Sequence, residues 1–242
     1  MKGFRPGVMP TLVVFALLPL LLWLGCWQLQ RADEKSDLLS AVDARRQAPP
    51  LAIAEVTQQP ALAYQRLRLH GRFDEQHSVL LDSRIRGGKA GVELLQPFYD
   101  QSSGIWLLVN RGWIAWPDRR VAPVFTTPSE PLTVQAWVYR PMGESFVLKQ
   151  SEGSGWPRLI NQVDVTVLWQ QLGLAGAPFE VRLEPGPASY EVDWPVVAMG
   201  PEKHTAYAVQ WFALALALLI LFIYFGWHNS KESKHDLVIS AN

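Results

Sequence analysis

Two long apolar runs, one near each end of the chain, constrain the fold more than any other feature of the sequence. Residues 8–29 and residues 205–227 contain no Asp, Glu, Lys or Arg. Each run has the roughly 20 residues that a helix needs to cross about 30 Å of hydrocarbon at about 1.5 Å per residue. Pro10 and Pro19 lie in the first run, where a transmembrane helix tolerates proline better than a soluble one does. The sequence therefore predicts two transmembrane helices that enclose residues 30–204.

The first run is predicted to remain in the mature protein as an anchor. Lys2 and Arg5 precede it as they would in a signal peptide, but no A-x-A-like cleavage site follows it. There is no Arg- and Ser-rich leader either, so we expect the inner membrane of a bacterium rather than a mitochondrial membrane. Basic residues flank both sides of the two runs, but a short basic segment before a first helix favours a cytoplasmic start. We expect cytoplasmic tails at residues 1–7 and 228–242, with both termini in the cytoplasm, and a periplasmic domain at residues 30–204.

The enclosed segment is predicted to be an α+β domain with a mainly antiparallel sheet or partial barrel. "RLRLHGRF", at residues 66–73, alternates apolar with charged side chains, as a strand with one buried face does. Five further segments are predicted to be strands and are separated by turn residues: "SVLLDSR", "VELLQPFY", "IWLLVNRGWIAW", "LTVQAWVY" and "PFEVRLE". In the last of these, Glu180, Arg182 and Glu184 oppose the apolar residues. One short helix is expected between Asp164 as N-cap and Gly173 just past its end, and residues 33–47 are expected to form a helical or irregular stalk.

Composition excludes several classes of protein. Lys and Arg number 22 and so do Asp and Glu, which leaves no global field for nucleic acid, so no nucleic-acid partner is expected. Cys26 is the only cysteine, so neither an intramolecular disulfide nor a multi-cysteine metal site can form.

Topology brings a set of polar and aromatic residues to one depth, because the first helix leaves the membrane where the second one enters it. These residues are Trp27, Gln28 and Arg31 on the first helix and His204, Tyr207 and Trp211 on the second. The last three stand at i, i+3 and i+7, which is one helical face. A neutral imidazole is a good iron ligand, aromatic rings can flank a flat macrocycle, and a guanidinium can pair with a propionate. The pattern suggests a cofactor site with His204 as the metal ligand.

A second interpretation of the same residues remains open. Trp and Tyr gather at membrane interfaces without any ligand, and an Arg or His at a helix end often extends into the lipid headgroups. Residue types alone do not separate these two interpretations.

Other patterns carry less chemistry. "RGGKAG", from residue 86, lacks the spacing of a phosphate-binding loop, so we expect an ordinary turn. The row of Arg66, Arg68, His70 and Arg72 is expected to be a solvated strand face, although it could also meet an acidic partner or anionic headgroups.

Four further side chains suggest hydrolase chemistry only by residue type. They are His77, Asp82, Ser78 and Ser83. No G-x-S-x-G elbow accompanies them, so an enzyme is not expected.

Several motifs occur in a recognisable order along the chain. "LGCWQLQRADEK" at the end of the first run is followed by "GVELLQPF" from Gly91, "LLVNRGWIAWP" from Leu107, "WPRLINQVDV" from Trp156 and "KHTAYAVQWFALA" from Lys203. The first motif is similar to the G-x-W-Q-L-x-R…K signature of the surfeit-locus-protein-one family, the cytochrome c oxidase assembly factors. The resemblance covers nearly the whole chain, including its plan of two spans.

The resemblance implies a function that the residue pattern alone does not. Members of the family are non-enzymatic membrane proteins that assist the maturation of haem-copper oxidases, and bacterial members are thought to bind haem a. The histidine at the start of the second helix is the implied iron ligand, which corresponds to His204. Both termini are implied to be cytoplasmic. In the enclosed domain only "NRGW" carries over, where Gly112 could permit a bulge and Trp113 could pack inward.

We therefore expect an assembly factor that holds haem a at the outer membrane interface and helps to place it in subunit I of an oxidase, alongside other assembly factors and membrane lipid. In this hypothesis Arg31 orients a propionate, and Gln28, Trp27, Tyr207 and Trp211 shape the pocket. One alternative is a scaffold that binds no cofactor and stabilises an assembly intermediate. Another is an anchored periplasmic hydrolase, which would need a nucleophile beside a base. The oxidase that is served stays open.

Overall fold

The computed structural model describes residues 6–56, 63–140 and 155–239, with side chains in the last helix described as far as residue 228. The chain forms two compact units. One comprises residues 1–41 and 195–242, and the other comprises residues 42–194.

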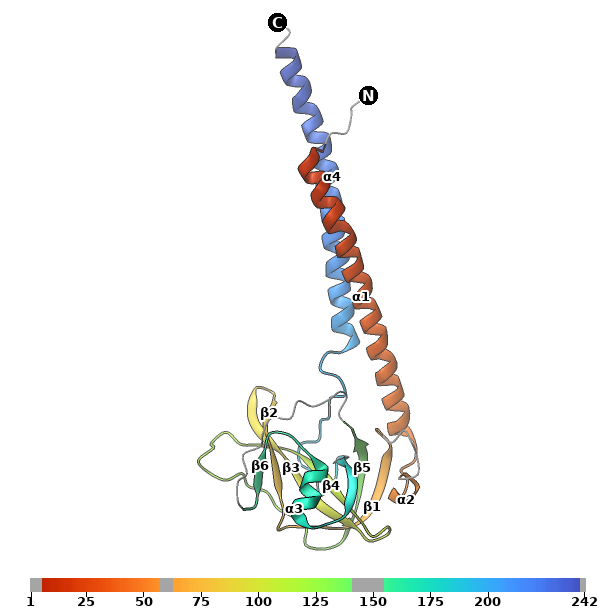
Figure 1. Cartoon of the computed structure of the whole chain (residues 1–242), viewed down its shortest axis with the longest axis vertical. Helices are drawn as coiled ribbons and strands as arrows, with labels where there is room; N and C mark the ends of the chain where they lie inside the picture. The colour runs from red at the N-terminus through yellow and green to blue at the C-terminus, as the bar shows by residue number, and fades with distance from the viewer. Residues whose placement is uncertain (1–5, 57–62, 141–154, 240–242) are drawn as a thin grey trace. The chain divides into compact units, whose positions relative to one another are not determined.

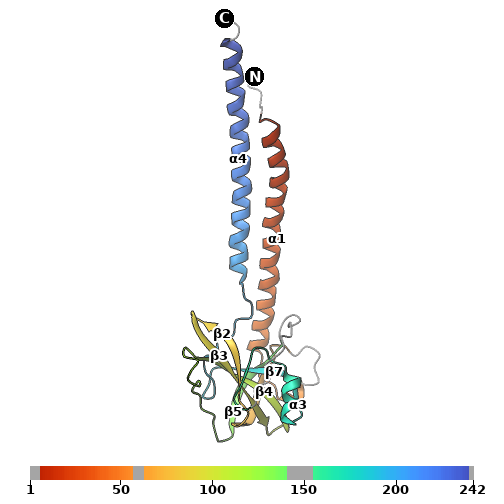
Figure 2. The same cartoon turned by 60° about the vertical axis from the view of Figure 1, so that its left-hand side comes forward.

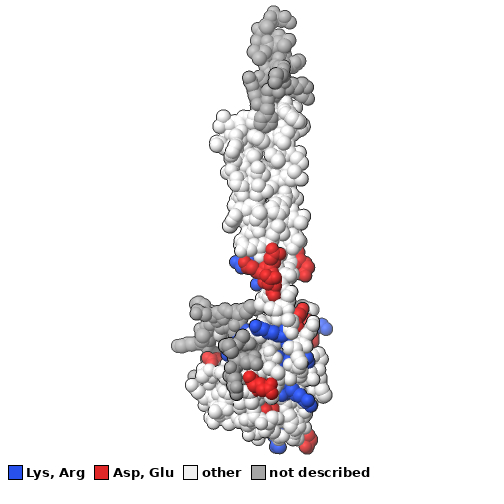
Figure 3. Space-filling view, turned by 90° about the vertical axis from the view of Figure 1, so that its right-hand side faces the viewer, with Lys and Arg blue, Asp and Glu red and all other residues white. Residues whose placement is uncertain are grey.

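The first unit is a pair of long helices. They are α1 (Val8–Gln47), whose last turns belong to the second unit, and α4 (Pro201–Ile239). Both are long and apolar enough to cross a membrane, as predicted. The two helices run side by side, and α1 begins at the end of the pair where α4 finishes (Figures 1 and 2). On the face that Figure 3 shows, the middle of the pair carries no charged side chain.

Both helices are longer than the predicted spans. The helix α1 does not end at Leu29 but continues to Gln47, so the predicted stalk is helical. The helix α4 begins at Pro201, a residue whose fixed φ and missing N–H suit the first helical position. This places His204 inside the first turn of α4 rather than in the segment before it.

Small side chains line the contact between α1 and α4. Gly25 is buried, and a Cβ at this position would lie 2.5 Å from Cε1 of Phe212 on α4. Ala208 and Ala215, seven residues apart on one face of α4, are 0% and 3% exposed. Small residues allow helix backbones to approach closely, which is how helices commonly pack in membranes.

The second unit is a barrel with an extension. Seven strands form one sheet in the order β1-β5-β7-β4-β3-β2-β6. Their bounds are β1 Arg66–Phe73, β2 Val79–Arg86, β3 Lys89–Asp100, β4 Ile105–Ala115, β5 Leu132–Tyr139, β6 Arg158–Ile160 and β7 Gly176–Leu183. Because β1 also pairs with β3, the strands β1, β5, β7, β4 and β3 close into a barrel, and β2 and β6 extend the sheet beyond it (Figure 1).

The barrel closes at Gly71. This residue pairs with Leu132 of β5 and with Asp100 of β3, so β1 passes from one neighbour to the other at this point. A Cβ at Gly71 would lie 1.8 Å from the carbonyl oxygen of Tyr99. Only glycine allows the two backbones to come this close.

Among the described residues of the unit, the two largest apolar clusters lie on opposite faces of the sheet. The barrel interior is filled by alternate residues of the strands: Leu67, Leu69, Phe98, Leu107, Val109, Val134, Val138, Phe179, Val181 and Leu183 are among them. On the outer face of β2, β3 and β4 lies a second cluster, which α3 (Val165–Leu172) covers with Leu168 and Trp169. The predicted caps of this helix are confirmed: Asp164 accepts a hydrogen bond from the Val167 N–H, and Gly173 is left-handed with φ 64°.

The predicted bulge at Gly112 is present. Glu93 of β3 pairs with Trp113 and Leu95 pairs with Asn110, so Arg111 and Gly112 together oppose one residue of β3. Gly112 has φ 113°, and Trp113 is buried as expected. The bulge therefore explains the glycine of the "NRGW" segment.

The fold class is as predicted, with some differences in detail. Five of the seven pairings are antiparallel, while β2–β6 and β4–β7 are parallel. The short elements α2 (Ile53–Val56) and β6 were not predicted, because three or four residues carry too little periodicity. "RGGKAG" is the turn between β2 and β3, with positive φ at both of its central glycines.

Candidate functional site

The site is built where the first turn of α4 meets α1. His204 faces the companion helix, and its Nδ1 lies 2.7 Å from Oε1 of Gln28. An amide oxygen only accepts hydrogen bonds, so this contact requires a proton on Nδ1. Gln28 lies at the end of the apolar run of α1, so the structure joins the two predicted segments at one depth.

A stripe of α4 continues from His204 along the face toward α1. Ala208, Trp211 and Ala215 lie within about 40° of His204 around the helix axis at 3.6 residues per turn. Trp211 is partly buried, and its Nε1 is fully covered without a hydrogen-bond partner. A covered donor in an apolar surrounding is costly, so Trp211 supplies an unused indole N–H two turns from the imidazole.

The structure separates Tyr207 from this stripe. It is 44% exposed, because position i+3 turns its ring away from the face on which Ala208 is fully buried. Trp27 is likewise 39% exposed on α1. The six predicted residues therefore do not converge on one point: His204, Gln28 and Trp211 lie along the helix contact, and the two exposed rings lie beside it.

Arg31 makes a local interaction that was not predicted from the sequence. Its Nη1 lies 2.8 Å from Oε2 of Glu34, and its guanidinium lies 5.6 Å from the ring centre of Trp27. Both partners are on α1, and the i,i+3 spacing of Arg31 and Glu34 is visible in the sequence. The contact with Glu34 uses one terminal nitrogen of the guanidinium.

The hydrolase-like residues do not form a nucleophile and base pair. Nδ1 of His77 lies 2.6 Å from Asp74, while Asp82 pairs with Arg119 at 2.7 Å. The Ser78 hydroxyl accepts a hydrogen bond from Gln96 inside the barrel. Of the four residues named from the sequence, Asp82 accepts a hydrogen bond from the backbone N–H of Ser83, and His77 pairs with Asp74 rather than with a serine hydroxyl.

The basic row on β1 is partly neutralised. Arg66 binds both carboxylate oxygens of Glu184 at 2.6 and 2.7 Å, and this pair raises the pKa of the Arg66 guanidinium. His70 meets the Thr133 hydroxyl at 3.0 Å. Arg68 and Arg72 are exposed. The structure thus supports a solvated face with two accessible cations.

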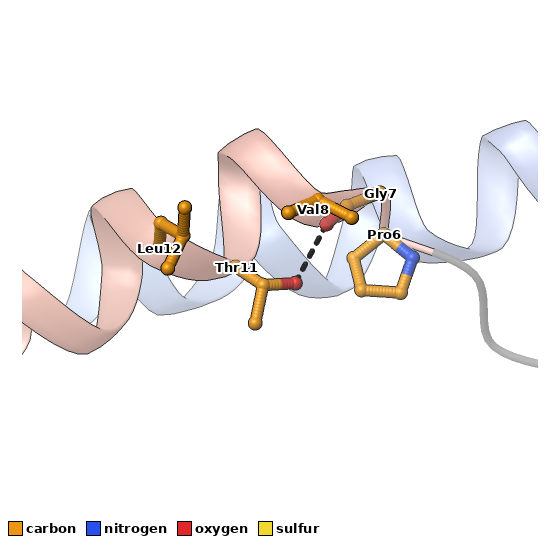
Figure 4. Close-up of a pocket in the computed structure, with 5 residues that line it drawn as sticks. All are labelled: Pro6, Gly7, Val8, Thr11 and Leu12. Atoms are coloured by element: carbon orange, nitrogen blue, oxygen red, sulfur yellow. Dashed lines mark hydrogen bonds between the residues drawn. The ribbon is translucent and has the colours of Figure 1, made fainter.

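A hollow at the start of α1 lacks the groups of a functional site. Figure 4 shows a hollow at the first turn of α1, where Thr11 Oγ1 donates to the carbonyl oxygen of Gly7 at 2.7 Å. Its other lining residues, Pro6, Val8 and Leu12, bring no titratable group. Within the described ranges, no three His, Cys, Asp or Glu side chains gather as a metal site would require.

A buried polar network on the sheet was not foreseen. Asn110 donates to Glu93 at 2.8 Å and to Glu180 at 3.1 Å, and Arg182 donates to Glu180 at 2.9 Å. Glu180 lies on the face of β7 opposite Phe179 and Val181, as the alternation predicts, and it is nevertheless only 5% exposed. The Asn-Arg-Gly-Trp segment contributes to this network through Asn110.

Arg111, the neighbour of Asn110, is also buried. It donates to the carbonyl oxygen of Ala188 at 2.8 Å and to Gln96 at 2.6 Å, and its guanidinium lies 4.8 Å from the ring centre of Phe73. Burial lowers the pKa of this guanidinium. These contacts give the "NRGW" segment a structural role.

Comparison with known proteins identifies relatives over most of the chain. The SURF1 family matches residues 15–216. A SURF1-like protein of Rickettsia felis is 26% identical over 237 residues, covering 88% of this chain and 95% of that protein. The cytochrome oxidase assembly protein SHY1 of Saccharomyces cerevisiae is 27% identical over 115 residues, covering 46% of this chain and 29% of SHY1. Surfeit locus protein 1 of Mus musculus is 26% identical over 115 residues, covering 41% and 37%.

Proposed function

The chain belongs to the SURF1 family, and from this premise we propose that it is an assembly factor for cytochrome oxidase that holds haem a through His204. The name of the yeast relative supports the assembly role, and the haem is our inference. Such a protein would receive haem a and assist its insertion into subunit I of the oxidase.

One observation carries the haem assignment. His204 lies at the contact of two apolar helices, and Gln28 engages one of its ring nitrogens at 2.7 Å. In a neutral imidazole with its proton on Nδ1, the other nitrogen carries the lone pair that a metal requires. In metal-bound histidines, the N–H of the second ring nitrogen usually donates a hydrogen bond to an oxygen in this way.

The surrounding residues fit a macrocycle with acidic edge groups. Trp211 has a covered N–H without an acceptor, and a propionate oxygen would accept from it. Trp27 and Tyr207 present exposed aromatic surface beside the helix contact that holds the imidazole. When bound, haem would supply an iron centre whose fifth or sixth position an imidazole can fill. A site with one imidazole suits a cofactor that is later given up, since a second facing ligand would hold the iron more tightly.

The proposed setting is a bacterial inner membrane. Two apolar helices of sufficient length support a membrane protein. We propose that both termini are cytoplasmic, that the barrel unit is periplasmic, and that this unit docks on subunit I. The role requires binding and release, so no catalytic residue is assigned.

Haem binding by the purified full chain in lipid nanodiscs tests the proposal. Absorption spectra would be recorded during titration with haem a for the native chain and for His204→Ala. His228→Ala is a matched control, because His228 stands on the same helix and stacks on Tyr224 at 5.9 Å. We expect the His204 variant to lose the absorption bands of histidine-ligated haem and stoichiometric binding, and the His228 variant to keep both. Unchanged spectra for His204→Ala would remove the ligand assignment.

A scaffold without cofactor is the second candidate. Arg68 and Arg72 support it, because both are exposed on β1 and could meet an acidic surface of an assembly intermediate. Arg66 is unsuited to test that idea, since removing it would leave Glu184 half-buried without its partner. The two candidate functions predict different effects of a His204 substitution on the haem a content of the oxidase in the cell.

A further inference from the structure

The contact between Gln28 and His204 assigns a role to a residue that does not itself bind iron. It is a direct hydrogen bond between a side chain of α1 and a side chain of α4. It lies beside a helix contact that is formed by small and apolar side chains such as Gly25 and Ala208. A polar contact in such surroundings fixes the orientation of both groups, because an apolar environment offers few alternative partners.

We propose that Gln28 is a positioning residue that selects the Nδ1–H tautomer of His204 and so makes Nε2 the ligand atom. A neutral imidazole carries one N–H, and its place is set by the hydrogen bond that the ring makes. The Gln28 oxygen at 2.7 Å takes the Nδ1 proton as its partner. This inference rests on the proposed haem function for its purpose, but the tautomer itself is a property of the protein without haem.

The chemistry of the acceptor adds a second step to the proposal. A carboxylate in the position of Gln28 would draw the Nδ1 proton strongly and raise the basicity of Nε2, as it does in carboxylate–histidine–metal arrangements. An amide is neutral and accepts more weakly. Gln28 therefore orients His204 while leaving it a moderate donor to iron. This combination suits a protein that must hold a porphyrin and then release it.

Nitrogen-15 NMR of the haem-free chain tests the tautomer directly. The full chain, labelled on histidine, would be studied in nanodiscs, and His204→Ala would assign the His204 signals. We expect a protonated Nδ1 and an unprotonated, pyridine-type Nε2. In Gln28→Leu the fixed tautomer should be lost, and in Gln28→Glu the Nδ1 proton should remain and move downfield. Gln30→Leu is the matched control, since Gln30 is exposed on the same helix and donates to Glu34.

Haem-loaded protein provides the second measurement. Loss of a partner that orients a metal-binding histidine typically weakens metal affinity by about 10- to 100-fold, and we expect this of Gln28→Leu. Gln28→Glu should bind ferric haem more tightly and lower its reduction potential, since a more basic imidazole favours the higher charge. A hydrogen bond that only joined the two helices would leave the nitrogen-15 signature of the His204 tautomer unchanged in Gln28→Leu.

The outcomes separate this inference from the proposed function. A protonated Nε2 in the native haem-free chain overturns the inference, whatever haem does. Unchanged affinity and potential in both Gln28 variants overturn it as well, provided that His204→Ala abolishes binding. If His204→Ala still binds haem normally, the haem function fails, and the NMR result then decides the tautomer alone. If Gln28→Leu does not fold, Gln28→Glu carries the test.

Discussion

Arg182 and Glu180, two residues apart on β7, form an ion pair that is almost wholly buried. The Arg182 Nε donates to Glu180 Oε1 at 2.9 Å, and the two side chains are 12% and 6% exposed. Three rings surround the guanidinium, whose Cζ lies 3.4 Å from the ring centre of Tyr139, 4.6 Å from that of Trp194 and 5.8 Å from that of Trp137. Excluding water strengthens the attraction within the pair but also makes each charge expensive to bury.

The first prediction concerns the pH dependence of stability at Glu180. Burial raises the pKa of this carboxyl, although Arg182 and Asn110 act in the opposite direction. The folded state therefore holds a proton on Glu180 more tightly than the unfolded state does. The resulting stabilisation is fully present below the pKa of the unfolded carboxyl and is lost as pH rises through the raised folded pKa.

Thermal unfolding of the full chain in detergent, followed by circular dichroism, measures this effect. We expect the native chain to lose stability relative to Glu180→Gln as pH rises above the range in which an exposed glutamate carboxyl titrates, because the neutral amide has no charge to bury. If the stability of the native chain instead rose relative to that of Glu180→Gln as pH increased, Arg182 would be holding Glu180 ionised throughout.

The second prediction concerns Asn110, whose amide nitrogen donates hydrogen bonds to both Glu93 and Glu180. Asn110→Asp removes that donor and places a third carboxyl between them. We expect a loss of about 3 kcal/mol or more in the free energy of unfolding, as for other unpaired buried charges. Asn161→Asp is the control, because Asn161 is exposed. Equal effects of the two changes on the unfolding midpoint in urea would contradict the role of Asn110.

Strong local patterns made much of the barrel predictable. The strand β1 occupies the predicted residues 66–73, because its alternation is uninterrupted, and α3 has the predicted caps at Asp164 and Gly173. Closure between β1 and β3 was not predictable, because it depends on Gly71 approaching the backbone of Tyr99, and that contact joins distant parts of the chain. Local sequence patterns carry little information about such pairings.

The candidate site divides along similar lines. Topology alone placed Gln28 and His204 at one depth, and the structure joins them. Tyr207 shares a face with His204 only loosely, since a step of three residues rotates it by about 60°. Arg31 pairs with Glu34 on the same helix, whereas the partner predicted from the sequence was a haem propionate.

The third prediction tests the point of barrel closure. In Gly71→Ala the added Cβ would meet the Tyr99 carbonyl oxygen at 1.8 Å, and backbone cannot move aside as a side chain can. We expect a destabilisation of roughly 2–4 kcal/mol, at the upper end for overpacked sites. Gly186→Ala is the control, because its Cβ would meet nothing closer than 3.9 Å. Similar melting temperatures for the native chain and Gly71→Ala would show that β1 and β3 are farther apart.

The fourth prediction concerns the helix contact beside the site. In Gly25→Leu the larger side chain would displace the Phe212 ring, which a Cβ alone would approach to 2.5 Å. Gly25 lies one turn from Gln28, so we expect the hydrogen bond to His204 to weaken and haem affinity to fall about tenfold or more. Adding Phe212→Ala should restore both the histidine nitrogen-15 shifts and the affinity. If the double variant recovers neither the nitrogen-15 shifts nor the haem affinity, the added leucine side chain does not act through the contact between the two helices.

The last prediction separates haem holding from scaffolding in the cell. Strains lacking the native gene would be complemented with the native chain, with His204→Ala or with a double charge reversal, Arg68→Glu and Arg72→Glu. We expect the His204 variant to accumulate normally while the assembled oxidase loses haem a, measured from the absorption spectrum of the membranes. The charge reversal should leave haem binding by the purified protein unchanged, because its two residues lie on β1, outside the helix pair that holds His204. Its co-purification with subunit I should weaken, and more so at low salt, where charge contributes most. The opposite result, a full haem a content with His204→Ala and a lost oxidase with the charge reversal, would favour the scaffold.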